Sequence, residues 1–165
     1  MMSKKLVQTI LIFSLFSFGI CAQEIKKGVK IYVELSPAGS FEITGSRFKG
    51  GKIKRKGDKF SVSDIYIPTN KLKTGIDLRD EHMRKRIKND SVLVKKAEGV
   101  NGEGKGVILI RDVEKDFSFT YRELDSKFIR AKFTLNLSDF KIPDISYMGV
   151  GVEDKIKVEV ILPFN

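Results

Sequence analysis

Residues 129–137 read IRAKFTLNL, a stretch in which apolar and polar side chains alternate without a break. The apolar positions are Ile129, Ala131, Phe133, Leu135 and Leu137. Because successive side chains of a β-strand point to opposite faces of a sheet, this period of two predicts a strand with one apolar face and one solvated face. Antiparallel sheets made of such strands cover an interior with their apolar side.

The same alternation recurs along the chain and predicts an all-β fold. Apolar side chains occupy alternate positions over 29–35, 41–43, 117–121 and 156–162. Further runs bring the total to about eight to ten strands, at 52–55, 59–67, 91–98 and 105–113.

Turn-forming residues separate these runs and suit tight connections. They lie at Ser36–Gly39, Gly50–Gly51, Lys56–Asp58, Asn101–Gly102, Glu114–Asp116 and Leu124–Ser126. Short antiparallel strands at this spacing form either a sandwich or a barrel. A closed barrel leaves no exposed sheet edge to aggregate, which favours the barrel.

One segment, residues 77–88, departs from the alternation and predicts a short helix. Its composition is rich in charged residues and helix formers, with Asp80 and Glu81 early and Arg84 late. Acidic residues in a first turn and basic residues in a last turn both suit the helix dipole. We expect Asp77 to cap this helix through its side chain.

The first 22 residues have the pattern of a secretory signal peptide. Lys4 and Lys5 precede an apolar stretch at 10–20, and Ile20-Cys21-Ala22 offers a cleavage site after Ala22. The apolar stretch is too short for a spanning helix, although an uncleaved anchor is an alternative. Lipidation at Cys21 is a second alternative, disfavoured by the bulky Ile20. We therefore expect an exported, periplasmic or secreted domain over residues 23–165.

Charge indicates possible partners without selecting one. The formal net charge of +10 falls to +8 once Lys4 and Lys5 are removed. A basic exported domain could favour anionic lipid head groups, acidic glycans or nucleic acid, or its charge could serve solubility alone. A basic run at 47–59 could bind an anionic head group or be a solvated hairpin. It lacks a row of interleaved aromatic residues, so we expect no nucleic-acid binding.

Several segments, in order, resemble one known family, the YceI-like proteins. The segments are Leu35–Phe41, Lys73–Gly75 with Leu78–Arg84, Val113–Phe117, and Leu137–Phe140 with Tyr147–Val152 and Asp154. The resemblance implies an eight-stranded, lipocalin-like antiparallel barrel, exported and periplasmic in Gram-negative bacteria. Several family members hold a long isoprenoid or another amphiphile inside the barrel. One departure is Arg111-Asp112, where the family often has His-Gly.

The chain offers little material for catalysis or metal binding. His82 is the only histidine, so a zinc site has no second imidazole, and no nucleophile-elbow pattern is present. Ser61, Ser63, Ser118 and Tyr121 have no catalytic spacing. We expect no enzyme, no metal and no cofactor, and a structural hydrogen-bonding role for His82.

Arg79 and Asp80 are expected to pin the helix over one mouth of the barrel. Removing one partner of a buried charge pair costs about 3–5 kcal/mol, so Arg79→Ala should affect folding more than binding.

The apolar strand faces could fill a core or line a cavity, and the pattern alone leaves both open. The resemblance favours a cavity that binds ligand through Ile31, Val33, Phe41, Ile43, Phe117, Phe119, Tyr121, Phe133, Leu135, Val158 and Val160. The expected partner is an isoprenoid or fatty-acid-like lipid, with possible transient membrane contact and a possible homodimer. The alternative is a cell-envelope structural or interaction protein with a filled barrel.

Overall fold

The computed structural model describes residues 25–164, so the expected signal segment lies outside the described residues. Eight strands have six residues or more: β1 (Gly28–Ser36), β2 (Ser40–Gly45), β4 (Lys59–Pro68), β5 (Ser91–Val100), β6 (Glu103–Ile110), β7 (Val113–Glu123), β8 (Phe128–Asn136) and β11 (Lys155–Pro163). Three are shorter: β3 (Lys54–Lys56), β9 (Ser146–Tyr147) and β10 (Val150–Val152). The helical elements are α1 (Asp77–Ile87) and the 3₁₀ turns η1 (Thr69–Lys71) and η2 (Ser138–Phe140).

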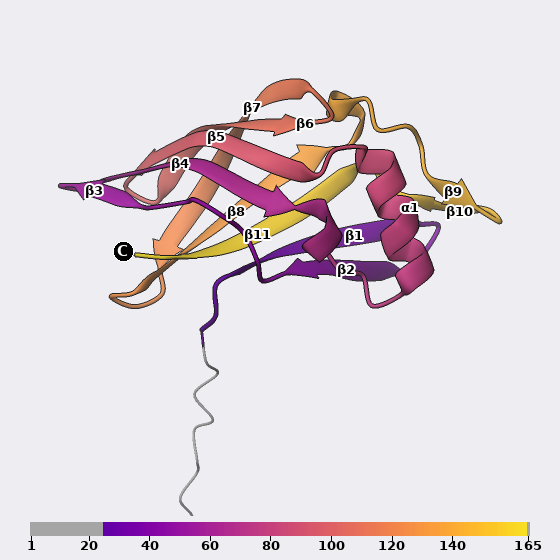
Figure 1. Cartoon of the computed structure of the whole chain (residues 1–165), viewed down its shortest axis with the longest axis horizontal. Helices are drawn as coiled ribbons and strands as arrows, with labels where there is room; N and C mark the ends of the chain where they lie inside the picture. Colours follow the sequence, from indigo (N-terminus) through magenta and orange to yellow (C-terminus); the bar gives the residue numbers. More distant parts are fainter. Residues whose placement is uncertain (1–24, 165) are drawn as a thin grey trace, which may run out of the picture.

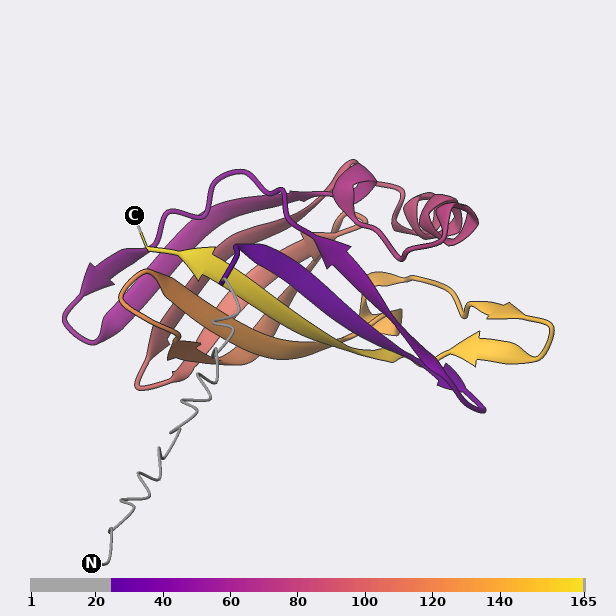
Figure 2. The ribbon, with the colours of Figure 1, turned by 90° about the horizontal axis from the view of Figure 1, so that it is seen from below.

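The strands form one strongly curled antiparallel sheet, a half-barrel, with α1 at one end (Figures 1 and 2). The eight longer strands follow the order β4-β5-β6-β7-β8-β11-β1-β2, and β3, β9 and β10 extend the sheet. This confirms the predicted all-β, lipocalin-like fold with a single short helix. Within residues 25–164, no helix has both the length and the apolar character needed to cross a membrane.

The seam between β2 and β4 is crossed by isolated backbone bridges rather than by a ladder. Lys49, in the connecting segment 46–53, exchanges two hydrogen bonds of 2.9 Å with Tyr66 of β4. Thr44 and Lys73 exchange two more, each 2.8 Å. At Gly50, with φ +76°, an added Cβ would lie 1.8 Å from the Asp64 carbonyl oxygen. The close passage of segment 46–53 along β4 therefore requires glycine at position 50.

A bulge in β5 helps the sheet to curl. The register between β5 and β6 shifts between Val94 and Lys96, so Lys95 is an extra residue in β5. On the other side of β5, the β4 ladder keeps its register, and Asp64 of β4 has a left-handed backbone with φ 56°. Bulges bend a strand and increase its twist, which draws the sheet around its apolar face.

The predicted boundary between the sixth and seventh strands is wrong. The run at 105–113 is not one strand, and residues 114–116 are not a turn but part of β7. The turn lies at Arg111 and Asp112, with φ values of 50° and 62°. Two positive φ angles are typical of the type I′ turn, whose twist matches that of a β-hairpin. The Arg111-Asp112 departure therefore still forms the hairpin, without the usual glycine signal.

Helix α1 begins and ends close to the predicted residues but is capped differently. Asp77 is its first residue, and Ile76 stands at the cap position without a side-chain cap bond. The predicted cap by Asp77 is therefore wrong. The acidic first turn and the basic last turn are as predicted, and Lys88 ends the helix with a left-handed backbone.

Candidate functional site

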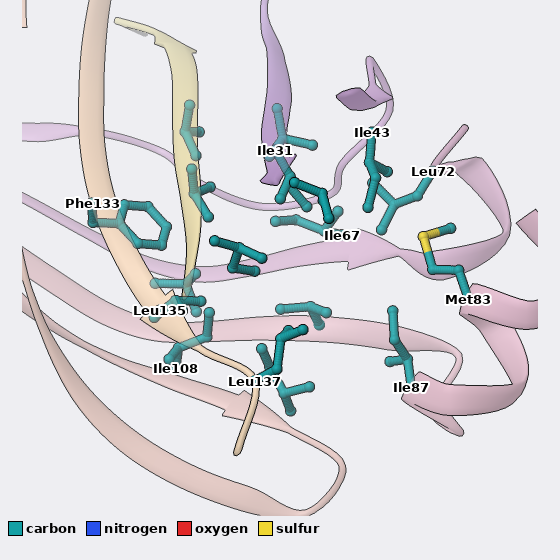
Figure 3. A pocket seen from close by; sticks show the side chains of 18 of the residues that line it. Ile31, Ile43, Ile67, Leu72, Met83, Ile87, Ile108, Phe133, Leu135 and Leu137 are labelled. Carbon is teal, nitrogen blue, oxygen red and sulfur yellow. The ribbon is translucent and has the colours of Figure 1, made fainter. Parts of the chain in front are cut away.

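The curled sheet encloses a cavity of about 1010 Å³. Its wall consists of apolar side chains from strands around the curl and from α1, which converge on a shared interior (Figure 3). Ligand pockets of proteins usually have volumes of about 300–1,000 Å³, so this cavity lies at the upper end of that range. The interior is not packed solid, in contrast to the filled-barrel alternative.

The structure places all eleven predicted ligand-binding residues on this wall. They are Ile31, Val33, Phe41, Ile43, Phe117, Phe119, Tyr121, Phe133, Leu135, Val158 and Val160. Their alternation therefore identifies the inner face of β1, β2, β7, β8 and β11 correctly. Their contact with a ligand stays a prediction.

Sequence reasoning missed the part of the wall that β4, the chain between β4 and α1, α1 itself, β5 and β6 supply. The missed residues include Ile65, Ile67, Leu72, Val92, Val94, Ile108, Met83 and Ile87. The bulge at Lys95 explains much of this omission in β5, because Val92 and Val94 face inward while the next inward residues are Ala97 and Gly99. A strict period of two would place Lys96 and Glu98 inside instead.

An aromatic cluster occupies the part of the cavity that lies away from α1. Its members in the cavity wall are Phe60, Phe117, Phe119, Tyr121 and Phe133, and Phe164, which does not line the cavity, packs against Phe60. Phe117 and Phe133 have ring centroids 4.6 Å apart, and Phe60 joins Tyr121 and Phe164, each at 5.6 Å. At Gly104 an added Cβ would lie 2.2 Å from the Phe119 ring. Glycine there lets β6 approach the rings closely, so this end of the cavity has an aromatic floor.

The opposite end of the cavity is cationic. The lysine and arginine side chains in its lining all come from α1, namely Arg79, Lys85 and Arg86. The Arg79 guanidinium lies over the Phe41 ring, with Cζ 4.2 Å from the centroid. Lys85 also pairs with Glu81 at 2.6 Å. The cavity therefore runs from an aromatic floor to a positively charged mouth.

Asp80 fixes α1 to the chain that leads into it. Its side chain is 1% exposed and accepts hydrogen bonds from the Thr74 backbone N–H at 2.7 Å and the Thr74 hydroxyl at 2.8 Å. The Lys73 ammonium lies 3.1 Å from its second oxygen. Burial acts to raise the pKa of Asp80, but these hydrogen bonds and the Lys73 charge outweigh it and lower the pKa to about 2. Asp80 is thus ionised and anchored at neutral pH.

Arg79 and His82 do not have the roles predicted for them. Arg79 stacks on Phe41 and forms no ion pair with any described carboxylate, so Asp80, not Arg79, carries the buried charge pair. His82 is exposed at the cavity mouth, and its ring makes no hydrogen bond to another described residue. Among residues 25–164, no three His, Cys, Asp or Glu side chains cluster in a manner suited to a metal ion.

The basic run at 47–59 lies outside the cavity. None of its lysine or arginine side chains lines the interior, and these residues are exposed. Two of them pair with carboxylates on other strands, Lys59 with Glu98 of β5 at 2.8 Å and Arg55 with Glu123 of β7 at 3.7 Å. This placement favours the solvated-hairpin interpretation over a head-group site.

Comparison with known proteins identifies a family and a fold for this chain. A family model described as the YceI-like domain matches residues 22–164. A search of curated proteins finds no match. The fold is similar to a polyisoprenoid binding domain from Saccharophagus degradans implicated in plant cell wall breakdown, with a TM-score of 0.56 and 10% identity. That match covers 82% of this chain and 91% of the other.

Two mutant forms of the CJ YCEI protein, one with a monobromobimane guest, are also similar in fold. Their TM-scores are 0.52, with identities of 15% and 16%, over 97% of this chain and 99% of theirs. Identities this low show a shared fold alone. The family model, however, covers all of the described residues, and the chain belongs to the YceI-like family.

Proposed function

We propose that this protein is an exported binding protein that holds an isoprenoid or another long-chain amphiphilic lipid inside its curled sheet. The observation that carries the proposal is the apolar cavity of about 1010 Å³, closed by aromatic rings at one end and cationic at the other. Membership of a family whose structural relatives include a polyisoprenoid binding domain supports it. The lipid tail would point toward the aromatic cluster and the polar head toward α1.

The energetics of tail burial are sufficient for tight binding. Each buried methylene contributes about 0.8 kcal/mol, so ten of them supply roughly 8 kcal/mol before the ordering of the chain is counted. No polar group is needed along the tail. Directional polar contacts are needed only where the head emerges, which is where Arg79, Lys85 and Arg86 lie.

The direct test is native mass spectrometry of the purified protein, followed by solvent extraction and identification of the extract. We expect a bound species with a long hydrocarbon chain, and uptake of a fluorescent fatty acid by protein stripped of its lipid. An empty protein that also takes up no fluorescent lipid would contradict the proposal. The same spectrum gives the mass of the exported chain, which separates cleavage after Ala22 from lipidation at Cys21.

The cations at the mouth predict a preference for an anionic head group. Arg79→Gln combined with Arg86→Gln should weaken binding of a long-chain fatty acid several-fold, because a carboxylate at the mouth loses two nearby positive charges. Binding of the alcohol of the same chain length should change little. Competition against a fluorescent probe measures both affinities.

A matched control is Lys54→Gln combined with Lys56→Gln. It removes the same charge from β3, outside the cavity. An equal loss of fatty-acid affinity in both double variants would assign the effect to net charge rather than to the mouth.

The other functions that the sequence left open have weaker support. A structural protein with a filled barrel is at odds with the cavity. For a hydrolase, Ser61 does line the cavity, but His82 makes no hydrogen bond to another described side chain that could form a catalytic pair.

A further inference from the structure

Exposed apolar side chains gather at the rim of the cavity mouth. Ile76 and Leu78 lie at the start of α1, and Met148 and Val150 lie in the β9–β10 hairpin. All four are exposed, Met148 at 86% and Leu78 at 62%, and all four also line the cavity. Two other large apolar residues of residues 25–164 are exposed, Tyr66 and Val100, and neither lines it. We define Ile76, Leu78, Met148 and Val150 as the apolar rim.

The two elements that carry the apolar rim lie at one end of the molecule. Both ribbon views place α1 and the β9–β10 hairpin at the end opposite the C-terminus (Figures 1 and 2). The apolar rim therefore continues the cavity wall outward on two sides of the mouth. The apolar layer of a membrane placed against this end would contact the apolar rim and the cavity interior at the same time.

Met148 stands where an apolar residue is unfavourable. The β9–β10 hairpin turns through Met148 and Gly149, with φ values of 50° and 81°. Two-residue turns with positive φ usually carry Asn-Gly or Asp-Gly, because a bulkier side chain is strained there. An exposed methionine in this position has neither burial nor backbone preference in its favour, which points to a functional contact.

Positive charge lies beside the apolar rim. The last turn of α1 and the residue after it supply Arg84, Lys85, Arg86 and Lys88. Of these, Arg84, Arg86 and Lys88 form no ion pair with any carboxylate of residues 25–164. Apolar side chains flanked by unpaired cations are typical of proteins that bind the surface of an anionic bilayer.

We propose that the apolar rim and the basic end of α1 form a docking surface for an anionic phospholipid bilayer, on which the mouth meets the membrane. The proposal rests on the proposed lipid-binding function and extends it to the route of lipid transfer. A docked mouth lets a hydrocarbon tail pass between bilayer and cavity without crossing water. The bilayer fits better than a protein partner because the rim side chains come from separate elements around an opening that itself accepts apolar chains.

Co-sedimentation with vesicles tests the docking surface. The wild-type protein should sediment with vesicles of phosphatidylglycerol and phosphatidylethanolamine, and at least tenfold less with vesicles of phosphatidylcholine. Binding should weaken at high salt, because salt screens exposed charges. Equal sedimentation with both kinds of vesicle, or with neither, would overturn the proposal.

Two variants locate the contact. Met148→Asn should reduce binding to anionic vesicles several-fold and keep the fold, because asparagine tolerates a left-handed backbone. Adding Leu78→Ser should reduce it at least tenfold. The control is Tyr66→Ser with Val100→Ser, which removes exposed apolar side chains that do not line the cavity. A loss in the control as large as in the rim variants would overturn the assignment.

The two experiments distinguish a failure of the docking proposal from a failure of the lipid-binding proposal. Wild-type protein that takes up a fluorescent fatty acid from solution but does not bind anionic vesicles disproves docking alone. Protein that binds the vesicles but takes up no fatty acid disproves the lipid-binding function on which docking rests.

Discussion

Val94→Trp combined with Val158→Trp should lower the affinity for a long-chain amphiphile at least tenfold. Both valines line the cavity, and three strands, β6, β7 and β8, separate β5 from β11 in the sheet order. Two indole rings introduced from separate parts of the curl would occupy the middle of the cavity. Losing room for only two or three methylenes removes about 2 kcal/mol of burial, which is more than tenfold in affinity.

The fold should survive these changes because the new rings enter an existing cavity. Overpacking a full core costs about 1–3 kcal/mol, and here part of the required volume is already present. Displacement of a fluorescent lipid by fatty acids of increasing length measures the effect, and the loss should grow with chain length.

The matched control introduces two tryptophans at positions outside the cavity. Val100→Trp with Val107→Trp adds two indole rings at positions that do not line the main cavity. Unchanged long-chain affinity in a folded Val94→Trp/Val158→Trp variant would show that the tail does not occupy the cavity.

Asp80→Ala should lower the free energy of unfolding by about 2–3 kcal/mol. The substitution leaves the Thr74 backbone N–H without its acceptor in a largely buried site, and it leaves the Thr74 hydroxyl only the longer bond of 3.2 Å to the Ile76 carbonyl oxygen. It also removes the contact that fixes α1 to the residues before it, so α1 should loosen over the mouth. Urea denaturation followed by circular dichroism measures the change.

The ionisation of Asp80 adds a pH dependence with a definite sign. Its pKa falls from the ordinary 3.8 to about 2 in the folded protein, so folding stabilises the charged form. The corresponding stability, about 2 kcal/mol, is fully present above about pH 5 and is lost as the pH falls toward 2. Asp80→Asn should flatten this part of the pH profile.

Lys73→Ala is the control for this site. Lys73 is 56% exposed, and solvent screening limits its pair with Asp80 to less than about 1 kcal/mol. A loss of stability in Asp80→Ala no larger than in Lys73→Ala would contradict the assignment of Asp80 as the anchor of α1.

Much of the fold and about a quarter of the wall, eleven of its 46 residues, follow from one local property, the alternation of side chains. It places Phe133 and Leu135 on the inner face because residues two apart in a regular strand point to the same face of the sheet. The alternation fails at Lys95, the extra residue of β5 in its ladder with β6, and at Asp64 of β4, which has a left-handed backbone. A bulge depends on how a strand pairs with its neighbour, which a single strand's pattern does not contain.

Other features were missed because their causes are three-dimensional. The turn at Arg111 and Asp112 contains no glycine, so the sequence pattern points to the charged residues just after it instead. Asp80 appeared as one of several acidic residues in a first turn. That it reaches back to Thr74 becomes visible only once the helix and the preceding loop are folded together.

The seam spanned by segment 46–53 has a consequence for the size of guest that the protein accepts. A barrel closed all round by ladders has its bore fixed by strand number and stagger. Here a few backbone contacts at Thr44 and Lys49 tie the two margins of the sheet together. The cavity can therefore widen at this seam while the hydrogen bonds between all paired strands are kept, which suits a protein that binds chains of unequal thickness.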